Sequence, residues 1–579
     1  MPNLLAMSFE GELAPSFDLR CLHDGAAAPD GWGIGYYPGG EPSAAVLKEP
    51  APPPGSMRSE LVKAWEHLET SLFVVHIRSA TWGAVSDANT QPFHRAWGGR
   101  DWLFAHSGSL VQRPTPRPGG PFEPVGSTDT ELVFCELMNR FAERGWRSLA
   151  EADLEVVRGW LQAFDELGNL TSVLADGHDL CVYAGRSGSR IFLCEVLPPY
   201  ERFALGDRDL EVDLCRRGVK ARKGVVVSSS PLEIDGEPAA DRWQAVPPGH
   251  LVVVRQGAVR AEVAPAGVSA SQLALPGTRR VVMARPRKAE VRRFEVTHRT
   301  SYRYERPVEQ STHLFRLAPV HDRLQTLLSH EMTVTVDGQW REYEDVFGNR
   351  TRRLHVETPF TEMVIEARSR VELLDTDPLS YKPLRARTEI PVVWMPWQRQ
   401  VLQPFLLPRE LPESELEELS DYAMSFAVRN DYDILDTLLD INGTIYREYK
   451  YTPGATTMAT TPFDIYANRR GVCQDFTNLF QLLAQLLGLP ARYVCGYVYT
   501  GPRHENQRQA EASHAWAQVY LPEVGWKGFD PTNGILTQTE HIRVAVGRNH
   551  RDATPTGGTI YVGGAGETLE VSVRVEPMP

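Results

Sequence analysis

Long hydrophobic runs are missing from this sequence of 579 residues. No apolar segment approaches the roughly 18 residues that a membrane-spanning helix needs. The amino terminus lacks the basic and then apolar order of a secretory signal. Positive charge is also in deficit, because 61 lysines and arginines face 74 aspartates and glutamates, for a net charge of −13. Such a chain is a poor partner for nucleic acid or an anionic membrane, and we expect a cytoplasmic protein.

Cysteine is scarce as well. The seven cysteines are odd in number and scattered, and no two of them form a CxxC pair. This pattern argues against a disulfide framework and against a structural zinc site, so we expect neither a metal nor a cofactor. The cysteines are Cys21, Cys135, Cys181, Cys194, Cys215, Cys473 and Cys495.

The remaining composition is that of an ordinary globular protein, with 42% hydrophobic and 23% charged residues. A chain of this length should form about three to four domains. Residues 1–258 alternate β-like runs with a few helices, and residues 259–290 have the composition of a linker. Residues 291–375 are predicted to be all-β, and residues 376–552 begin with helical patterns. Residues 553–579 are expected to form a tail.

One apolar helix is preceded by a cysteine. In "RRGVCQDFTNLFQLLAQLLGLPARYVCGY" (469–497), apolar residues follow a helical spacing from Phe476 onward, and Cys473 lies at or just before the first turn. The N-terminal end of a helix carries unpaired N–H groups and a partial positive charge, which both stabilise a thiolate. A cysteine at this position is therefore a candidate nucleophile, although most single cysteines at helix starts are structural.

A base and an orienting carboxylate are available downstream. The segment "ASHAWAQVYLPEVGWKGFDPTNG" (512–534) is typical of a β-hairpin that turns at "PEVG". This hairpin brings Asp530 within a residue or two of direct opposition to His514. A thiolate nucleophile needs such a base, and the base needs such a carboxylate. Taken singly, either residue is more commonly a surface or hydrogen-bonded residue.

These segments together with "HIRVAVGRNHRD" resemble the bacterial transglutaminase-like family over about residues 290–552. The resemblance implies a papain-like core with a Cys–His–Asp triad. It makes Cys473 the nucleophile, His514 the general base and then acid, and Asp530 the residue that orients His514. It also implies that the preceding β-rich module is a β-sandwich. Cys495, on a strand-like segment, is most simply a core residue.

The bond that is attacked stays open at this point. The chemistry implies a thioester formed from an amide, which water or an amine can resolve. We favour hydrolysis of a peptide, isopeptide or γ-glutamyl bond, and keep two alternatives: a true amine-transferring transglutaminase and a non-catalytic binding or scaffold protein. The family often occurs beside ATP-grasp ligases, which implies a partner in a peptide-ligase pathway.

The first 258 residues resemble the class-II glutamine amidotransferases, which are N-terminal-nucleophile hydrolases. The resemblance rests on "MPNLLAMSF", "DGWGIGYYP", "HIRSATWGAVSDANTQPF", "FAHSGSL" and "GSTDTELVF". It implies an αββα sandwich. The whole chain is therefore predicted to be a multidomain α+β protein that combines this sandwich, a central β-sandwich and a papain-like transglutaminase core.

Two chemical positions depart from the amidotransferase pattern. Pro2 stands where the family has its nucleophilic cysteine, and Ser107 replaces the asparagine that precedes Gly108. Arg78 and Asp129 match the residues that grip the glutamine substrate. Because proline has no nucleophilic side chain and one oxyanion donor contributes about 10²–10³ in rate, we predict that this domain does not hydrolyse glutamine. Arg78 and Asp129 either bind an amino-acid-like group or stabilise the fold.

Overall fold

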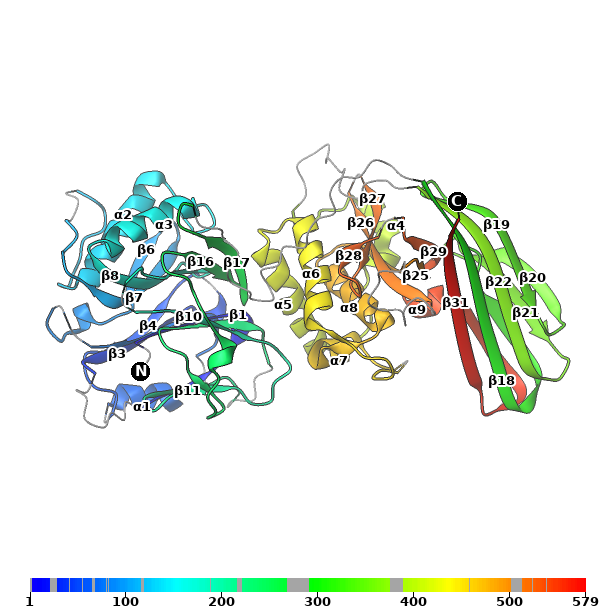
Figure 1. Cartoon of the computed structure of the whole chain (residues 1–579), viewed down its shortest axis with the longest axis horizontal. Helices are drawn as coiled ribbons and strands as arrows, with labels where there is room; N and C mark the ends of the chain where they lie inside the picture. Colours follow the sequence, from blue (N-terminus) through cyan, green and yellow to red (C-terminus); the bar gives the residue numbers. More distant parts are fainter. Residues whose placement is uncertain are drawn as a thin grey trace. The chain divides into compact units, whose positions relative to one another are not determined.

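The computed structural model describes residues 3–578, except 21–28, 41, 55, 65–67, 80, 82, 116–118, 188, 216–220, 268–290, 375–388, 458, 501–512, 523 and 538 (Figure 1). The chain divides into two compact units, Met1–Arg280 and Val281–Pro579. Pro2, Cys21 and most of the predicted linker lie outside the described residues.

Two large sheets make the centre of the first unit. A seven-stranded sheet has the order β15-β10-β13-β1-β5-β3-β4, and a six-stranded sheet has the order β17-β16-β9-β8-β7-β6. Their facing side chains, such as Leu4, Val74 and Val173, form one buried core. The first sheet comprises β1 (Leu4–Leu13), β3 (Gly31–Tyr36), β4 (Ala45–Glu49), β5 (Thr70–Arg78), β10 (Phe192–Val196), β13 (Gly224–Ser228) and β15 (Trp243–Ala245). The second comprises β6 (Phe93–Trp97), β7 (Arg100–Leu110), β8 (Gly168–Ala175), β9 (Asp179–Tyr183), β16 (Leu251–Arg255) and β17 (Ala258–Val263).

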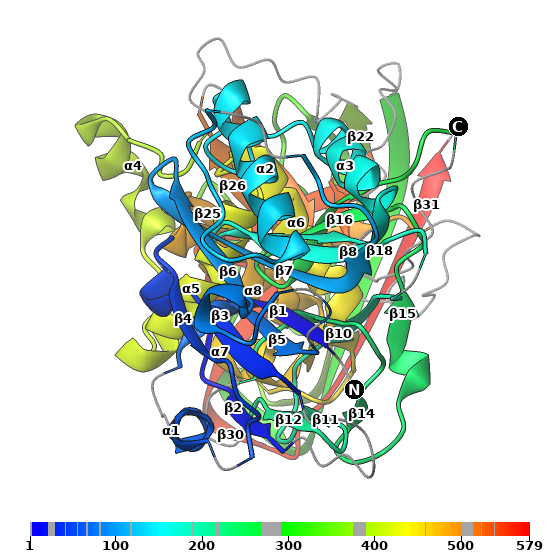
Figure 2. The same ribbon diagram turned by 90° about the vertical axis from the view of Figure 1, so that its left-hand side faces the viewer.

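The outer faces of these sheets are covered differently. Helices α2 (Asp129–Arg144) and α3 (Leu154–Asp165) pack on the six-stranded sheet (Figure 2). The seven-stranded sheet is covered by α1 (Met57–Ala64) and a small sheet of order β14-β11-β12-β2. The expected pair of sheets with helices outside is thus present, but the second outer layer is mixed. The small sheet comprises β2 (Ser16–Leu19), β11 (Ala204–Gly206), β12 (Leu210–Asp213) and β14 (Glu233–Ile234).

The boundary expected after residue 258 is wrong by at least one strand. β17 begins at Ala258 and pairs with β16 along its whole length. Its residues Val263 and Ala261 contribute to the core beneath α2 and α3. The strand therefore belongs to the first unit, because its apolar side chains complete that core.

A long strand organises the β-module of the second unit. β18 (Val291–Phe315) pairs on one side with β22 (Phe360–Leu374) and β21 (Arg350–Val356), and on the other with β31 (Thr568–Met578) and β30 (Thr556–Ala565). The remaining strands are β19 (Gln325–Val334) and β20 (Gln339–Glu344). The named elements between residues 291 and 374 are all strands.

The tail expected at residues 553–579 is wrong. Residues 556–565 and 568–578 are strands β30 and β31, and β31 matches β18 from Arg293↔Met578 to Arg303↔Thr568. Val573 is buried among Phe294 and Val296 of β18. These strands form because a partner about 240 to 285 residues away supplies their hydrogen bonds, and that partner is not visible in the local pattern.

The transglutaminase-like part packs helices against a five-stranded sheet of order β28-β27-β26-β25-β29. α8 (Cys473–Leu486) lies at the centre, and its Phe480 stacks on Phe529 of the sheet at 5.3 Å between ring centroids. The other helices are α4 (Pro396–Leu406), α5 (Glu413–Arg429), α6 (Ile434–Glu448), α7 (Pro462–Asn468) and α9 (His550–Ala553). The strands are β25 (Ala491–Val498), β26 (His514–Leu521), β27 (Gly525–Asp530), β28 (Ile535–Leu536) and β29 (His541–Gly547), with a short pair β23 (Lys450–Tyr451) and β24 (Arg470–Gly471).

Candidate active site

Cys473 is the first residue of α8, as its position before the apolar stripe predicts. Its side chain is half-buried and packs against a small cluster that includes Tyr493, Cys495 and Ala515. The first turn is fixed by Asp475, whose Oδ2 accepts hydrogen bonds from the backbone N–H of Val472 (2.9 Å) and from the hydroxyl of Thr456 (2.7 Å). Asp475 thus holds the start of the helix and ties the preceding loop to it.

The chain that leads into α8 is held by a buried arginine. Arg469 takes a left-handed backbone conformation (φ 52°), and its guanidinium lies 4.7–5.0 Å from the ring centroids of Tyr422, Tyr449 and Tyr466. One guanidinium nitrogen donates to the hydroxyls of Tyr422 and Tyr449, each at 2.8 Å. These contacts offset the strain of the left-handed residue and fix the path of the chain four residues before Cys473.

The hairpin brings His514 and Asp530 together. β26 and β27 pair with Ala517 opposite Phe529, so His514 at the start of β26 lies near Asp530 at the end of β27. His514 Nε2 is 2.9 Å from Asp530 Oδ2, and Cys473 is near enough to the His514 ring to raise the pKa of His514. Since Nε2 is engaged by the carboxylate, Nδ1 is the ring atom that remains for the sulfur. The three predicted residues therefore lie together in one site.

Asp530 is fully buried and accepts five hydrogen bonds. Its Oδ1 accepts from the backbone N–H groups of Thr532 (3.1 Å) and Asn533 (3.2 Å). Its Oδ2 accepts from the side chains of Asn533 (2.7 Å), His514 (2.9 Å) and His541 (3.0 Å). A carboxylate with this many donors is held in one orientation. Without these donors, the burial of its charge would cost free energy.

The ionisation of this pair follows from its surroundings. Burial alone lowers the pKa of His514, but the charge of Asp530, its hydrogen bond and the nearby Cys473 outweigh burial and raise that pKa to about 10. For Asp530, burial acts to raise the pKa, while His514 and the donor hydrogen bonds hold it well below its usual range. At neutral pH the pair is an imidazolium and a carboxylate.

Cys495 behaves as the core residue that the sequence predicts. It is buried on β25, and burial followed by the proximity of Cys473 raises the pKa of its thiol to about 12. A thiol of this kind is protonated at neutral pH and is unreactive. Of the two cysteines in this cluster, only Cys473 has the position and the partner that nucleophilic chemistry needs.

The predicted residues of the first unit also come together. Arg78, Ser107, Gly108 and Asp129 line one polar cavity of about 50 Å³. Asp129, the first residue of α2, accepts hydrogen bonds from the backbone N–H groups of Leu110 (2.8 Å) and Thr130 (2.9 Å). The other lining residues are Asn3, His76, Ile77, Ser79, Thr81, Asn89, Gln91, His106, Thr128 and Thr130.

Two details of this cavity bear on its role. The Arg78 guanidinium donates to the carbonyls of Ala84 (3.3 Å) and Gly83 (3.4 Å), so a surface loop holds it in place. Gly108 has φ 141°, and a Cβ there would lie 2.3 Å from the carbonyl oxygen of Asn169. Only glycine fits this close approach without a shift of the backbone.

Models of known protein families match both halves of the chain. Residues 1–275 match the model of the glutamine amidotransferases class-II. Residues 294–372 match the bacterial transglutaminase-like N-terminal region, and residues 422–531 match the transglutaminase-like superfamily. The chain is a fusion of a class-II glutamine amidotransferase domain with a bacterial transglutaminase-like protein. This combination supports, in general terms, a cysteine-dependent hydrolase or transferase.

Individual relatives cover one half of the chain each. An uncharacterised protein of Mycobacterium tuberculosis is 32% identical over 300 residues, which are 49% of this chain and 93% of the relative. YafJ of Escherichia coli, named as a candidate glutamine amidotransferase, is 29% identical over 256 residues, 43% of this chain and 96% of YafJ. A crystal structure of a candidate cysteine protease from Cytophaga hutchinsonii is 21% identical, with a TM-score of 0.41, and covers 50% of this chain and 92% of that one.

Two residues of the transglutaminase-like site are not assigned by the sequence. Asn533 follows Asp530 in "DPTNG", and His541 opens the "HIRVAV" segment that carries part of the family resemblance. Both donate to Asp530 Oδ2. The family motif includes both segments. It does not indicate a contact between β29 and the end of β27, which are not neighbouring strands.

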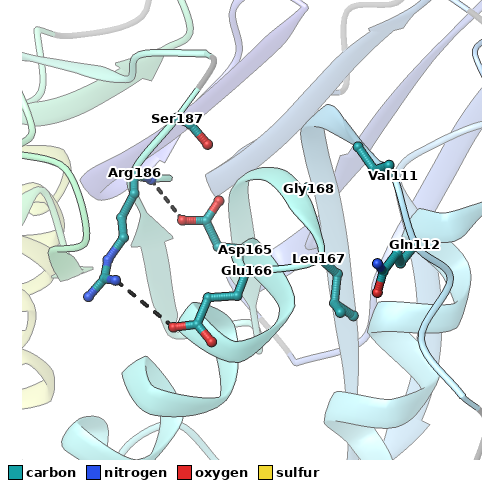
Figure 3. A pocket seen from close by; sticks show the side chains of 8 residues that line it. All are labelled: Val111, Gln112, Asp165, Glu166, Leu167, Gly168, Arg186 and Ser187. Carbon is teal, nitrogen blue, oxygen red and sulfur yellow. Dashed lines mark hydrogen bonds and ion pairs between the residues drawn. The ribbon is translucent and has the colours of Figure 1, made fainter.

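A larger cavity of about 370 Å³ lies elsewhere in the amidotransferase domain (Figure 3). It is lined by residues 111–112, 165–168 and 186–187, and none of the predicted site residues reaches it. Asp165 accepts from the backbone N–H groups of Arg186 (2.8 Å) and Leu170 (2.9 Å), and Glu166 pairs with Arg186 at 3.9 Å. These contacts hold the turn between α3 and β8 in place.

The described residues also bear on metals and membranes. Within them, no group of three or more histidine, cysteine, aspartate or glutamate side chains is arranged to hold a metal ion. None of the described helices combines the length and apolar character needed to cross a membrane.

Proposed function

We propose that the transglutaminase-like half is a cysteine amidohydrolase that cleaves a peptide, isopeptide or γ-glutamyl bond through a thioester at Cys473. His514, which starts protonated beside Asp530, acts as acid in the first half of the reaction and as base in the second, and Asp530 orients it. The single observation that carries this proposal is the meeting of Cys473 at the start of α8 with His514, which is hydrogen-bonded to the buried Asp530. The position of Cys473 at the start of α8 supports the same role, because unpaired N–H groups at a helix start can hold an oxyanion.

The proposed reaction has two halves. The Cys473 sulfur bonds to the amide carbonyl carbon, the carbon–nitrogen bond breaks, and the amine leaves with the proton that His514 held. Water then attacks the thioester and gives a proton to His514, which releases the carboxylic acid and the thiolate. Attack by an amine instead of water would make the protein a transglutaminase in the strict sense. We favour water as the acceptor, and expect the protein to work in the cytoplasm on peptide-like substrates beside a peptide ligase.

We infer a binding role for the amidotransferase domain, without glutaminase activity. Pro2 offers no nucleophilic side chain, and Ser107 lines the cavity where the family has its oxyanion-hole asparagine. Arg78 and Asp129 line the same cavity, which supports recognition of the carboxylate and amine of an amino-acid-like group. Isothermal titration of the full chain with glutamine, glutamate and γ-glutamyl peptides tests this role, with Arg78→Met as the control. Absence of heat for all ligands would assign Arg78 and Asp129 to the fold alone.

Alkylation of the cysteines tests the catalytic proposal directly. At neutral pH, Cys473 should react with iodoacetamide much faster than Cys495 in the same molecule, and Cys473→Ala should remove the fast label. Equal and slow labelling would favour the alternative of a non-catalytic scaffold. A screen of γ-glutamyl and α-linked peptides then identifies the bond, and incorporation of a fluorescent amine into an acceptor protein would favour the transferase alternative.

A further inference from the structure

We propose that His541 is a second imidazole donor to the shared carboxylate, and that it limits how firmly Asp530 holds the proton of His514. The inference rests on the function proposed for Cys473, His514 and Asp530, and it adds a positioning residue to their site. It concerns a residue that makes no contact with a substrate and acts through Asp530.

Both imidazoles use the same carboxylate oxygen. Asp530 Oδ2 accepts from His514 Nε2 at 2.9 Å and from His541 Nε2 at 3.0 Å, and the two ring centroids are 6.4 Å apart. The His541 side chain is 1% exposed. It starts β29, and its ring meets the face of Trp516 edge-on at 5.1 Å. The site thus presents one buried anion to two imidazole rings.

The donor role of His541 follows from its surroundings. An ionised carboxylate only accepts, so Nε2 of His541 carries the hydrogen that it donates to Asp530. Its Nδ1 is buried and has no hydrogen-bond partner among the described residues. The groups that face His541 are Asp530 on β27, His514 and Trp516 on β26, and the paired Val498 on β25.

The hydrogen bond from His541 to Oδ2 also changes how strongly Asp530 attracts the proton of His514. Each hydrogen bond to a carboxylate stabilises its negative charge and reduces its remaining affinity for protons. The N–H group of His541 therefore weakens the attraction between Asp530 and the proton on His514. This matters because His514 must keep its proton before the reaction and must then release it to the leaving amine. Without His541, the imidazolium would be more stable and the proton harder to release.

The pH dependence of Cys473 alkylation by iodoacetamide tests the inference on the full chain. The rate profile should have an upper step where His514 loses its proton. In His541→Phe, which keeps a ring against Trp516 but removes the donor, this step should move upward by about one pH unit. In His541→Gln, whose amide can still donate to Oδ2, the step should stay near its wild-type position.

A buried histidine outside the site supplies the matched control. His298 is also in the second unit, and its ring nitrogens contact Thr300 (2.8 Å) and Tyr497 (3.0 Å). His298→Phe should lower stability and leave the upper step where it is. An unmoved step in folded His541→Phe, or the same movement in His298→Phe, would overturn the inference.

A second measurement covers a His541→Phe variant that does not fold. Nitrogen-15 NMR of histidine-labelled wild-type protein at pH 7 should show a hydrogen on Nε2 of His541 that is hydrogen-bonded to a carboxylate. A His541 ring without that hydrogen would overturn the inference. Slow alkylation of wild-type Cys473 would instead remove the proposed function, and the NMR measurement would still show whether His541 donates to Asp530 because it observes the ring directly.

Discussion

Replacing Asp530 by asparagine tests the electrostatic reasoning most severely. The substitution keeps the shape of the side chain and removes its charge. The pKa of His514 is raised to about 10, because the charge and hydrogen bond of Asp530, together with Cys473, outweigh burial, which acts to lower it. Without the carboxylate, burial dominates and His514 becomes neutral at pH 7. Cys473 then loses its cationic partner.

The expected loss can be measured in two ways. Because a nearby cation makes a cysteine more reactive, the rate of Cys473 alkylation in Asp530→Asn should fall by roughly tenfold. Turnover, once a substrate is known, should fall by about 10⁴, as for a Ser–His–Asp triad that loses its carboxylate. Asp345→Asn is the matched control, because Asp345 is a hydrogen-bonded carboxylate of the β-module that does not contact the triad.

The pairing of His514 with Asp530 also makes the stability of the fold depend on pH. Because the pKa of His514 is raised in the folded protein, its pairing with Asp530 stabilises the fold fully below about pH 6.5 and loses this effect as the pH rises through about 10. The difference in free energy of unfolding between wild type and Asp530→Asn should therefore be larger at pH 6 than above pH 10. A folded variant whose alkylation rate stays within twofold of wild type at pH 7 would refute the reasoning.

Three further predictions concern the fold around the sites, each measured by urea unfolding. Arg469→Met should cost about 3 kcal/mol, because it removes two hydrogen bonds from a buried cation and its contacts with the tyrosine rings; a cost near zero would contradict the role given to the buried arginine. Val573→Ala should cost about 2 kcal/mol and the exposed Val571→Ala under about 0.5, whereas equal costs would mean that β31 is not packed on β18. Gly108→Ala should destabilise the amidotransferase domain, since its Cβ meets a backbone oxygen, while Gly159→Ala, which meets nothing within 4 Å, should not.

The arrangement of the triad was largely predictable. The helical stripe placed Cys473 at a helix start, and the hairpin pattern placed His514 near Asp530, because both are short-range consequences of periodicity and turn chemistry. The cavity around Arg78 and Asp129 was expected from family resemblance alone. Arg78 comes from β5, Ser107 and Gly108 from β7, and Asp129 from α2, and no local pattern relates these elements to one another.

The sequence by itself determined the types of the elements around Cys473, the absence of a nucleophilic side chain at residue 2 and the acidic balance of the chain. Only the tertiary structure decided which distant segments meet. It turned the expected tail into strands β30 and β31 by pairing them with β18, and it placed His541 of β29 on a carboxylate of β27. The physical reason is the range of the interactions: helix stripes and hairpins are set by neighbours in sequence, whereas strand pairing and a shared buried charge depend on backbone and side chains that the fold brings together.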